Sequence, residues 1–282
     1  MSNTLRAPEP RETNSCLAAF RIATLLLVIL SSAGLPARAQ AESPREQAIR
    51  SAGKIQVCIW PGYFAISYRD PRTGILEGID IDLARNLARD LGVEASFVDS
   101  SHARFMNDLD AGRCDVAMFG IGVTPQRRER VDFTAPYLRS GLYGVTNLNN
   151  QRINGWDDLD QPGVTVAVLA GTYMEPLMRR LLKTATVSVV AAPATREAEV
   201  KAGRADALIA DYPYTRLMVR TYEWARVIEP SRPVALTDYA YAVRKGDPQW
   251  LARVDAFVAA IKRNGRLAEA AATHGLYPIV VQ

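Results

Sequence analysis

Short apolar runs alternate with helically spaced segments along this chain, and this alternation constrains the fold more than any other feature. Residues 54–60, 95–98 and 115–119 are short and rich in β-branched or apolar side chains, which is typical of buried strands. Between them, residues 80–91 carry apolar side chains at helical spacing, and residues 105–109 form a second, shorter helix. Strands that alternate with helices predict an α/β fold with a mostly parallel sheet covered by helices.

A second alternating block follows, and the chain ends in two further helices. Because those C-terminal helices can cover the first block, we predict a discontinuous first lobe, residues 42–140 plus 238–282, with a second lobe, residues 141–237, inserted into it. Extended segments near residues 140–144 and 237–241 would cross between the lobes and act as a hinge. The second block contains predicted strands 164–169, 187–190 and 206–210, helices 172–182, 196–202 and 212–220, an extended segment 238–243, and C-terminal helices 248–263 and 265–273.

The first 41 residues have the pattern of a secretory signal peptide. A basic start precedes an apolar run at residues 22–30, and small residues at Ala37, Ala39 and Ala41 fit a cleavage site near Ala39–Ala41. The run is too short to span a bilayer. Cys16 lies before the run, so no lipid anchor is expected. We therefore predict an exported mature chain.

The charge of the chain gives little support to nucleic-acid binding. The formal net charge is +4, and residues 1–39 hold four Arg and two Glu, so the remainder carries +2. Its Lys and Arg residues are scattered among acidic residues rather than grouped with aromatic ones. No nucleic-acid partner is expected.

Two cysteines follow the predicted signal peptide, Cys58 and Cys114. In an oxidising compartment a disulfide between them must be considered. Both belong to predicted neighbouring strands, but their offsets from the strand ends differ by several residues. At roughly 3.3 Å per residue, this difference exceeds the reach of a disulfide. We therefore expect two buried thiols.

Residues that follow the predicted strands are candidate ligand-binding residues, because open α/β sheets bind ligands outside the carboxyl ends of their strands. They comprise aromatic side chains, one His, one acid and several Gly or Thr, which suits a small, partly apolar carboxylated ligand. Structural roles remain open for each: core aromatics, a loop His, glycines that serve a turn, and an Asp that caps the next helix. The candidates are Trp60, Tyr63, His102, Gly120, Gly122, Thr172 and Asp211.

Arg127 is the candidate cation of this site. Residues 115–137 are predicted to form a strand, a Gly-rich turn, and a helix that opens with Thr124 and Pro125, a good N-cap and a tolerated first position. Arg127 follows within the first helical turn. A guanidinium beside free backbone N–H groups is suited to a carboxylate, although an isolated Arg at this place would usually be a surface residue.

The sequence contains few of the residue groupings that are typical of catalytic sites. The chain has two His, no HExxH or paired-Cys spacing, no nucleophile elbow and no Gly-rich phosphate loop with Lys, so neither a metal site nor a cofactor is expected. Glu175, Asp211 and His102 are the titratable groups placed to act as acid or base. This pattern indicates binding rather than catalysis.

Two motifs resemble the signatures of periplasmic solute-binding proteins of the amino-acid class, family 3. The first is residues 78–91, GIDIDLARNLARDL, and the second is residues 120–127, GIGVTPQR, followed by VDFTAPY at residues 131–137. The resemblance runs from about residue 54 to the C-terminal helices. It implies a two-lobed type II fold, with two mostly parallel sheets joined by two hinge strands. It also implies a periplasmic monomer that closes over a ligand and delivers it to an ABC permease of the inner membrane.

The resemblance also implies residue roles. Arg127 looks like the clamp for the α-carboxylate, helped by backbone at Gly120, and Asp211 looks like the acceptor for the α-ammonium group. The positions of Tyr63 and His102 resemble those of aromatic residues that flank the ligand side chain. Thr172 resembles the contact from lobe two to the carboxylate.

The chain departs from the family pattern in its specificity pocket. Gly122 stands where amino-acid binders usually carry a Thr, Trp60 where a small or acidic residue is common, and His102 where an aromatic residue is expected. The leading prediction is a binding protein for a polar amino acid or related small carboxylate. Two alternatives stay open: an enzyme on the same fold that resembles cyclohexadienyl (prephenate/arogenate) dehydratase, with Glu175 as its acid, and a ligand sensor for a membrane receptor.

Overall fold

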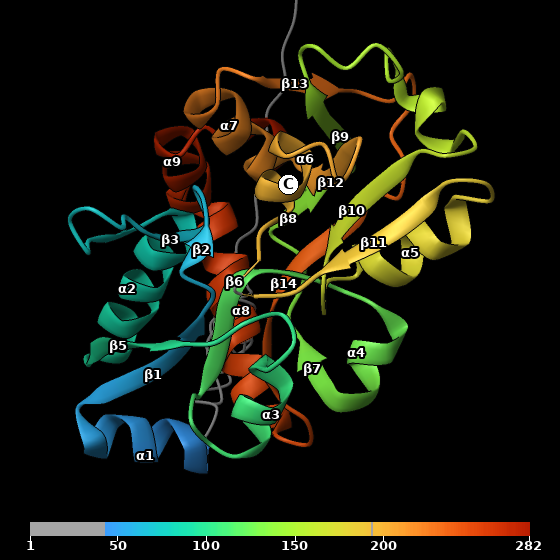
Figure 1. Cartoon of the computed structure of the whole chain (residues 1–282). Coiled ribbons are helices and arrows are strands. Elements are labelled where there is room, and N and C mark those ends of the chain that lie inside the picture. The colour runs from blue at the N-terminus through green and yellow to red at the C-terminus, as the bar shows by residue number, and fades with distance from the viewer. Residues whose placement is uncertain (1–42, 193) are drawn as a thin grey trace, which may run out of the picture. The chain divides into compact units, whose positions relative to one another are not determined.

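The computed structural model describes residues 43–192 and 194–282, so the predicted signal peptide lies outside the described residues. Within these ranges the chain forms two large sheets and one small sheet, with helices between many of the strands (Figure 1). Over the same ranges, the structure contains no helix with the length and apolar character needed to cross a membrane.

The first sheet has six strands in the order β5-β1-β6-β14-β7, with β8 paired to β14. Strands β1, β5 and β6 are parallel, whereas β14 runs antiparallel to β6, β7 and β8. Figure 1 shows β14, in orange, beside β6, in green, although more than 110 residues separate them in sequence. The strands are β1 (Lys54–Ile59), β5 (Glu94–Asp99), β6 (Val116–Gly122), β7 (Val131–Phe133), β8 (Leu138–Ser140) and β14 (Thr237–Arg244).

Helices from both ends of the described chain cover the first sheet. Helix α2 contacts β1, β5 and β6, and its apolar stripe is buried as its spacing predicts. The C-terminal helix α8 contacts β14, and the indole Nε1 of Trp250 donates to the backbone oxygen of Asp115 at 2.9 Å. The helices are α1 (Pro44–Ala52), α2 (Ile79–Leu91), α3 (Phe105–Asp110), α4 (Pro125–Arg130), α8 (Pro248–Arg263) and α9 (Arg266–Thr273), with a final 3₁₀ turn η2 (Tyr277–Ile279).

The second sheet has five strands in the order β11-β10-β12-β9-β13. Strands β10, β11 and β12 are parallel, and β9 runs antiparallel to both β12 and β13. The strands are β9 (Leu142–Asn147), β10 (Thr165–Leu169), β11 (Thr186–Val190), β12 (Ala207–Asp211) and β13 (Ala225–Ile228). The helices of this part are α5 (Met174–Leu181), α6 (Arg196–Lys201) and α7 (Tyr212–Thr221), with a 3₁₀ turn η1 (Trp156–Asp160).

The chain passes between the two large sheets twice, at Gly141 and between the ends of β13 and β14. The two passages touch, since the backbone N–H of Leu142 donates to the carbonyl of Val234 at 3.0 Å. The exact lobe boundaries and the hinge residues stay predictions.

A small antiparallel sheet was not predicted, because its strands have only two or three residues each. It comprises β2 (Gly62–Tyr63), β3 (Ser67–Arg69) and β4 (Leu76–Glu77), in a region predicted to be a turn. This sheet matters for the site because it holds Tyr63 in a buried position.

The predicted Gly-rich turn at Gly120 and Gly122 is wrong, since both residues belong to β6. The strand continues through them because β14 offers pairing partners up to Tyr239, opposite Gly122. The register of that pairing shifts between Ala240 and Ala242, and Gly120 has a φ of 59°. A left-handed Gly opposite a register shift lets the strand bend without ending.

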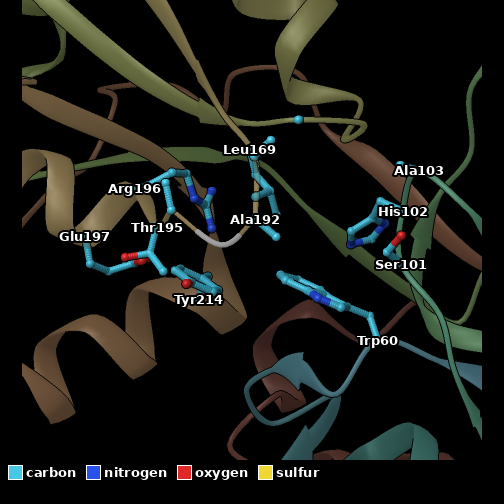
Figure 2. Close-up of a pocket in the computed structure, with 13 residues that line it drawn as sticks. Trp60, Ser101, His102, Ala103, Leu169, Ala192, Thr195, Arg196, Glu197 and Tyr214 are labelled. Atoms are coloured by element: carbon cyan, nitrogen blue, oxygen red, sulfur yellow. The ribbon is translucent and has the colours of Figure 1, made fainter.

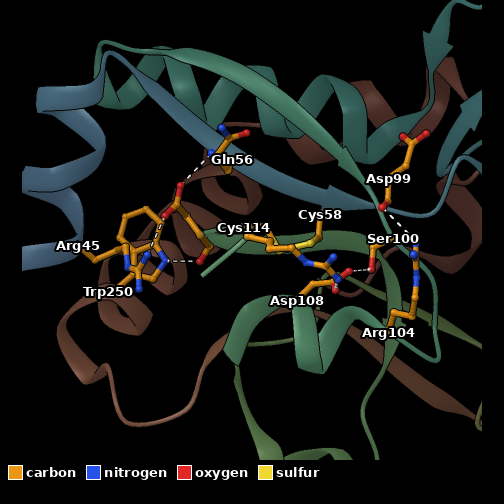
Figure 3. Close-up of a disulfide and its surroundings, with 11 residues drawn as sticks. Arg45, Gln56, Cys58, Asp99, Ser100, Arg104, Asp108, Cys114 and Trp250 are labelled. Carbon is orange, nitrogen blue, oxygen red and sulfur yellow. Dashed lines mark hydrogen bonds and ion pairs between the residues drawn. A yellow bond between two sulfur atoms is a disulfide. The ribbon is translucent and has the colours of Figure 1, made fainter. Parts of the chain in front are cut away.

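The expectation of two free thiols is also wrong, because Cys58 and Cys114 form a disulfide with a Cα–Cα distance of 5.5 Å (Figure 3). The error came from treating Cys114 as part of a strand, in which each residue would add about 3.3 Å to its offset from Cys58. Cys58 lies opposite Ala117, and β6 continues five residues beyond that pair to Gly122, whereas β1 ends at Ile59. Cys114 itself precedes β6, which begins at Val116, so the spacing of strand residues does not fix its distance from Cys58.

Candidate functional site

The candidate site lies where strand ends of the first sheet meet strand ends of the second. Several side-chain hydrogen bonds cross between them: the hydroxyls of Tyr63 and Tyr239 donate to Asp211, and the guanidinium of Arg127 donates to the carbonyl of Gly171. Tyr63 and Arg127 follow β1 and β6, and Gly171 and Asp211 mark the ends of β10 and β12. The candidates were chosen because ligands bind at the carboxyl ends of strands in open α/β sheets. In the structure, candidates from both halves of the chain lie close together.

Arg127 is a buried cation held by its helix start and by carbonyl groups. Thr124 caps α4 as predicted, its hydroxyl accepting from the Arg127 N–H at 3.2 Å. Nη1 donates to the Gly122 carbonyl at 2.8 Å and Nη2 to the Gly171 carbonyl at 3.2 Å. Burial lowers the pKa of Arg127 to about 10, so it stays protonated at neutral pH. Within residues 43–192 and 194–282 it makes no ion pair with a carboxylate.

Asp211 caps the next helix, the structural role left open for it, and also accepts from two tyrosine hydroxyls. Its Oδ1 accepts from the Tyr214 N–H at 3.3 Å and so caps α7. Its Oδ2 accepts from the hydroxyls of Tyr63 and of Tyr239, the latter at 2.5 Å. Burial, and then the negative charge of Asp211, raise the pKa values of both tyrosines well above their ordinary value. Both phenols are therefore protonated donors.

His102 and Trp60 form an aromatic wall. Their ring centroids are 5.0 Å apart, and Phe119 lies 5.1 Å from the His102 ring on another side. Burial, followed by the positive charges of Arg127 and Arg196, lowers the pKa of His102 well below its ordinary value, so the ring is neutral. Its Nδ1 is buried and has no hydrogen-bond partner among the described residues.

The two glycines have structural tasks that the sequence did not show. The N–H of Gly120 in β6 donates to Oδ2 of Asp80 in α2 at 2.8 Å, so it is already bonded within the first part of the fold. A Cβ added to Gly122 would meet the Tyr173 ring at 2.8 Å. The aromatic ring of Tyr173 therefore occupies the space of the side chain that amino-acid binders were expected to carry there.

Thr172 and Glu175 differ in how they face the site. Thr172 is buried, and its hydroxyl donates to the Leu169 carbonyl at 2.8 Å, which leaves its oxygen lone pairs as the groups that face outward. Glu175 instead turns back along its own helix. Its Oε2 accepts from the Gly171 N–H at 3.5 Å and its Oε1 lies 3.6 Å from Arg179 Nη2.

Three cavities adjoin these residues. One of about 320 Å³ is lined by Trp60 and His102, and a small one of about 20 Å³ is lined by Trp60, Tyr63, His102, Thr172 and Asp211. Arg127 lines a third cavity, of about 610 Å³, together with Thr172. Five of the predicted residues thus line the small cavity, while Arg127 lines the third cavity, which shares Thr172 with the small one.

Sequence reasoning missed the residues that complete the cavity lined by Trp60 and His102. Arg196, Glu197 and Tyr214 line the cavity of about 320 Å³ together with Trp60 and His102 (Figure 2). A signal was present, since Arg196 and Glu197 follow the predicted strand 187–190, whose carboxyl end was not searched. Tyr239 was missed because it lies inside a strand rather than after one, and its side chain reaches Asp211 only in three dimensions.

Comparison with known proteins identifies the class. The chain matches the family of bacterial extracellular solute-binding proteins, family 3, over residues 55–276, and it belongs to that family. It is 31% identical over 232 residues to a cyclohexadienyl dehydratase of Pseudomonas aeruginosa, covering 80% of this chain and 85% of that protein. It is 26% identical over 250 residues to the L-cystine-binding protein TcyJ of Escherichia coli, covering 86% and 90%.

Solved structures confirm the predicted fold class. The structure of AncCDT-1, described as an ancestral amino acid-binding protein and a precursor of cyclohexadienyl dehydratase, matches with a TM-score of 0.73 and 30% identity, covering 81% of this chain and 98% of that one. The protein therefore has the two-lobed type II fold of amino-acid-binding proteins. We call the parts built on the first and second sheets lobe one and lobe two.

Proposed function

We propose that this protein binds an amino-acid zwitterion between its lobes and acts as the substrate-binding component of an ABC importer. One observation carries the proposal: Arg127, a buried guanidinium that pairs with no carboxylate among the described residues, and Asp211, a buried carboxylate, lie in contacts that join the two lobes. Buried charges are expensive unless they are paired. An α-carboxylate at Arg127 and an α-ammonium group at Asp211 would pair both charges at once.

Relatives support this reading. Their names include proteins that bind L-cystine, glutamine and L-arginine. We extend to this chain the ligand class they share, an amino acid, together with the expected partner, an ABC permease of the inner membrane. The predicted signal peptide supports a periplasmic location, and we expect the protein to act as a monomer.

Calorimetric titration with an amino-acid panel tests the proposal, using Arg127→Met and its exposed neighbour Arg128→Met as a matched control. Both variants lose one positive charge from the same helix. Removing a charge-assisted contact from the closed site should weaken binding by about 2–5 kcal/mol in Arg127→Met only. Equal affinities in the two variants, or no binding by any amino acid, would contradict the proposal.

We infer that the protein is a binder rather than an enzyme, even though one relative is named a dehydratase. Glu175, the acid that this alternative needs, is bonded to the Gly171 N–H and lies beside Arg179. It does not line the cavity that holds Trp60 and His102. Incubation with prephenate and arogenate should therefore give neither phenylpyruvate nor phenylalanine above the uncatalysed rate. Turnover that Glu175→Gln abolishes would establish the enzyme instead.

A further inference from the structure

Two oppositely charged residues at the start of α6 face the aromatic cavity. Arg196 is 4% exposed and Glu197 is 8% exposed, and both line the cavity of about 320 Å³. Thr195 fixes their position by capping α6, its hydroxyl accepting from the Ala198 N–H at 3.2 Å. Figure 2 shows Arg196 and His102 on facing sides of the cavity, with Trp60 below them.

Arg196 makes fewer hydrogen bonds than its guanidinium can donate. Its Nη1 donates to the Ile209 carbonyl at 2.6 Å, and its guanidinium carbon lies 4.4 Å from the centre of the Tyr214 ring. A guanidinium has five N–H donors. Across residues 43–192 and 194–282, no carboxylate forms an ion pair with it, not even that of its neighbour Glu197. A buried cation in this setting requires an acceptor from elsewhere.

Two further polar side-chain atoms at the same cavity are also unsatisfied. Oε1 of Glu197 and Nδ1 of His102 are buried without a hydrogen-bond partner among the described residues. Buried polar atoms in native proteins are nearly always bonded to protein, water or ligand. Most of the remaining lining is apolar, chiefly Trp60, Leu169 and Ala192, with Ser101 and Thr195 as polar exceptions. The cavity is therefore apolar along its walls and polar at one end.

We propose that this cavity holds the distal end of the amino-acid ligand, and that Arg196 and Glu197 select a distal group that is polar and electrically neutral. A carboxamide or ureido group has a carbonyl oxygen for Arg196 and N–H donors for Glu197. A carboxylate would meet the charge of Glu197 and a guanidinium that of Arg196, so each charged group is repelled by one member of the pair. This inference rests on the proposed function, because it assumes that the amino-acid head group binds near Arg127 and Asp211.

Two pairs of ligands with the same shape test the inference directly. Glutamine and glutamate differ at their distal ends only in an amide against a carboxylate, and citrulline and arginine only in a ureido group against a guanidinium. In calorimetric titration of the wild-type protein, the neutral member of each pair should bind at least about tenfold more tightly. A charged member that binds as tightly as its neutral partner, or more tightly, would overturn the inference.

Each single substitution should shift the affinity ratio of one pair towards its charged member. Glu197→Gln removes the negative charge and should shift the glutamine-to-glutamate affinity ratio towards glutamate by about tenfold or more, whereas Arg196→Met should shift the citrulline-to-arginine ratio towards arginine by a similar factor. Thermal unfolding of both variants checks that they fold. Unchanged ratios in folded variants would overturn the inference.

The outcomes separate this inference from the proposed function. If amino acids bind and Arg127→Met abolishes their binding, but the paired ligands bind equally, the distal selection is wrong and the proposed function stands. If alanine binds and none of the four paired ligands does, the same conclusion follows. If no amino acid binds, both proposals fail.

Discussion

Two buried aspartates in this molecule have almost the same surroundings and very different places in the fold. Asp80 accepts from the hydroxyls of Tyr137 and Tyr241 and from a backbone N–H. Asp211 likewise accepts from two tyrosine hydroxyls and a backbone N–H. Every partner of Asp80 belongs to lobe one. The tyrosines that bind Asp211 belong to lobe one, whereas Asp211 itself ends a strand of lobe two.

This difference separates a structural carboxylate from a responsive one. The network of Asp80 would be unchanged by any movement of one lobe against the other. The network of Asp211 would break in such a movement, and its carboxylate would become available to an ammonium group. The same chemistry therefore stabilises one lobe in the first case and joins two lobes in the second.

The largest effect should separate the two aspartates by ligand affinity. Asp211→Asn keeps the helix cap but removes the charge that faces the ligand ammonium group, and it should weaken binding by about 2–5 kcal/mol. Asp80→Asn should leave the affinity within about threefold, a difference below about 1 kcal/mol. Calorimetric titration of both variants measures the contrast. Similar losses in both would refute the division between structural and responsive carboxylates.

The disulfide should affect lobe one alone. Cys58 and Cys114 are 56 residues apart, so replacing both with Ala should lower the free energy of unfolding by about 4 kcal/mol through the entropy of the unfolded chain. Ligand affinity should not change, because neither cysteine lines any of the three cavities that adjoin the site. Urea denaturation with and without reductant provides the test. Reductant should destabilise the wild-type protein and leave the double variant unaffected.

Asp80 should make stability depend on pH in an unusual direction. Burial raises its pKa to about 7, above the ordinary value of 3.8. Between these values the folded protein holds a proton that the unfolded chain has released. The contribution to stability, up to about 4 kcal/mol, is therefore complete below pH 3.8 and is lost as the pH rises through 7.

Asp80→Asn serves as the reference for this effect because it removes the titrating group. The difference in free energy of unfolding between the wild-type protein and this variant should decline from pH 4 to pH 7, and denaturation across this range measures it. A constant difference would show that Asp80 titrates as an ordinary carboxylate.

The smallest effect concerns single hydroxyl groups. Tyr63→Phe removes one of the two hydroxyls that compete with the ligand ammonium group for Asp211, so affinity should rise by about 1 kcal/mol, roughly fivefold. Tyr137→Phe makes the matched change at Asp80 and should leave affinity unchanged while lowering stability. Weaker binding by Tyr63→Phe would show that its hydroxyl supports the ligand-bound arrangement rather than competing with it.

Local patterns predicted most helices and the longer strands. The apolar stripe of α2, the Thr124 cap of α4 and the limits of α8 depend on neighbouring residues and were read correctly from spacing. The short strands of the small sheet and the continuation of β6 through Gly120 were not, because pairing partners distant in sequence create them. The disulfide was misjudged because Cys114 precedes β6, and the path of the chain before a strand is a tertiary property.

The sequence by itself determined the class of the protein and the kinds of residue in its site. Alternating strands and helices, and the motifs at residues 78–91 and 120–137, depend on local periodicity and on short-range chemistry, which a sequence displays directly. Only the tertiary structure decided which atoms face one another. Tyr63 and Tyr239 donate to Asp211, and Gly120 donates to Asp80. Arg196 and Glu197 line the same aromatic cavity. The direction of a side chain across a cleft depends on packing between segments about 150 residues apart, and no local pattern encodes it.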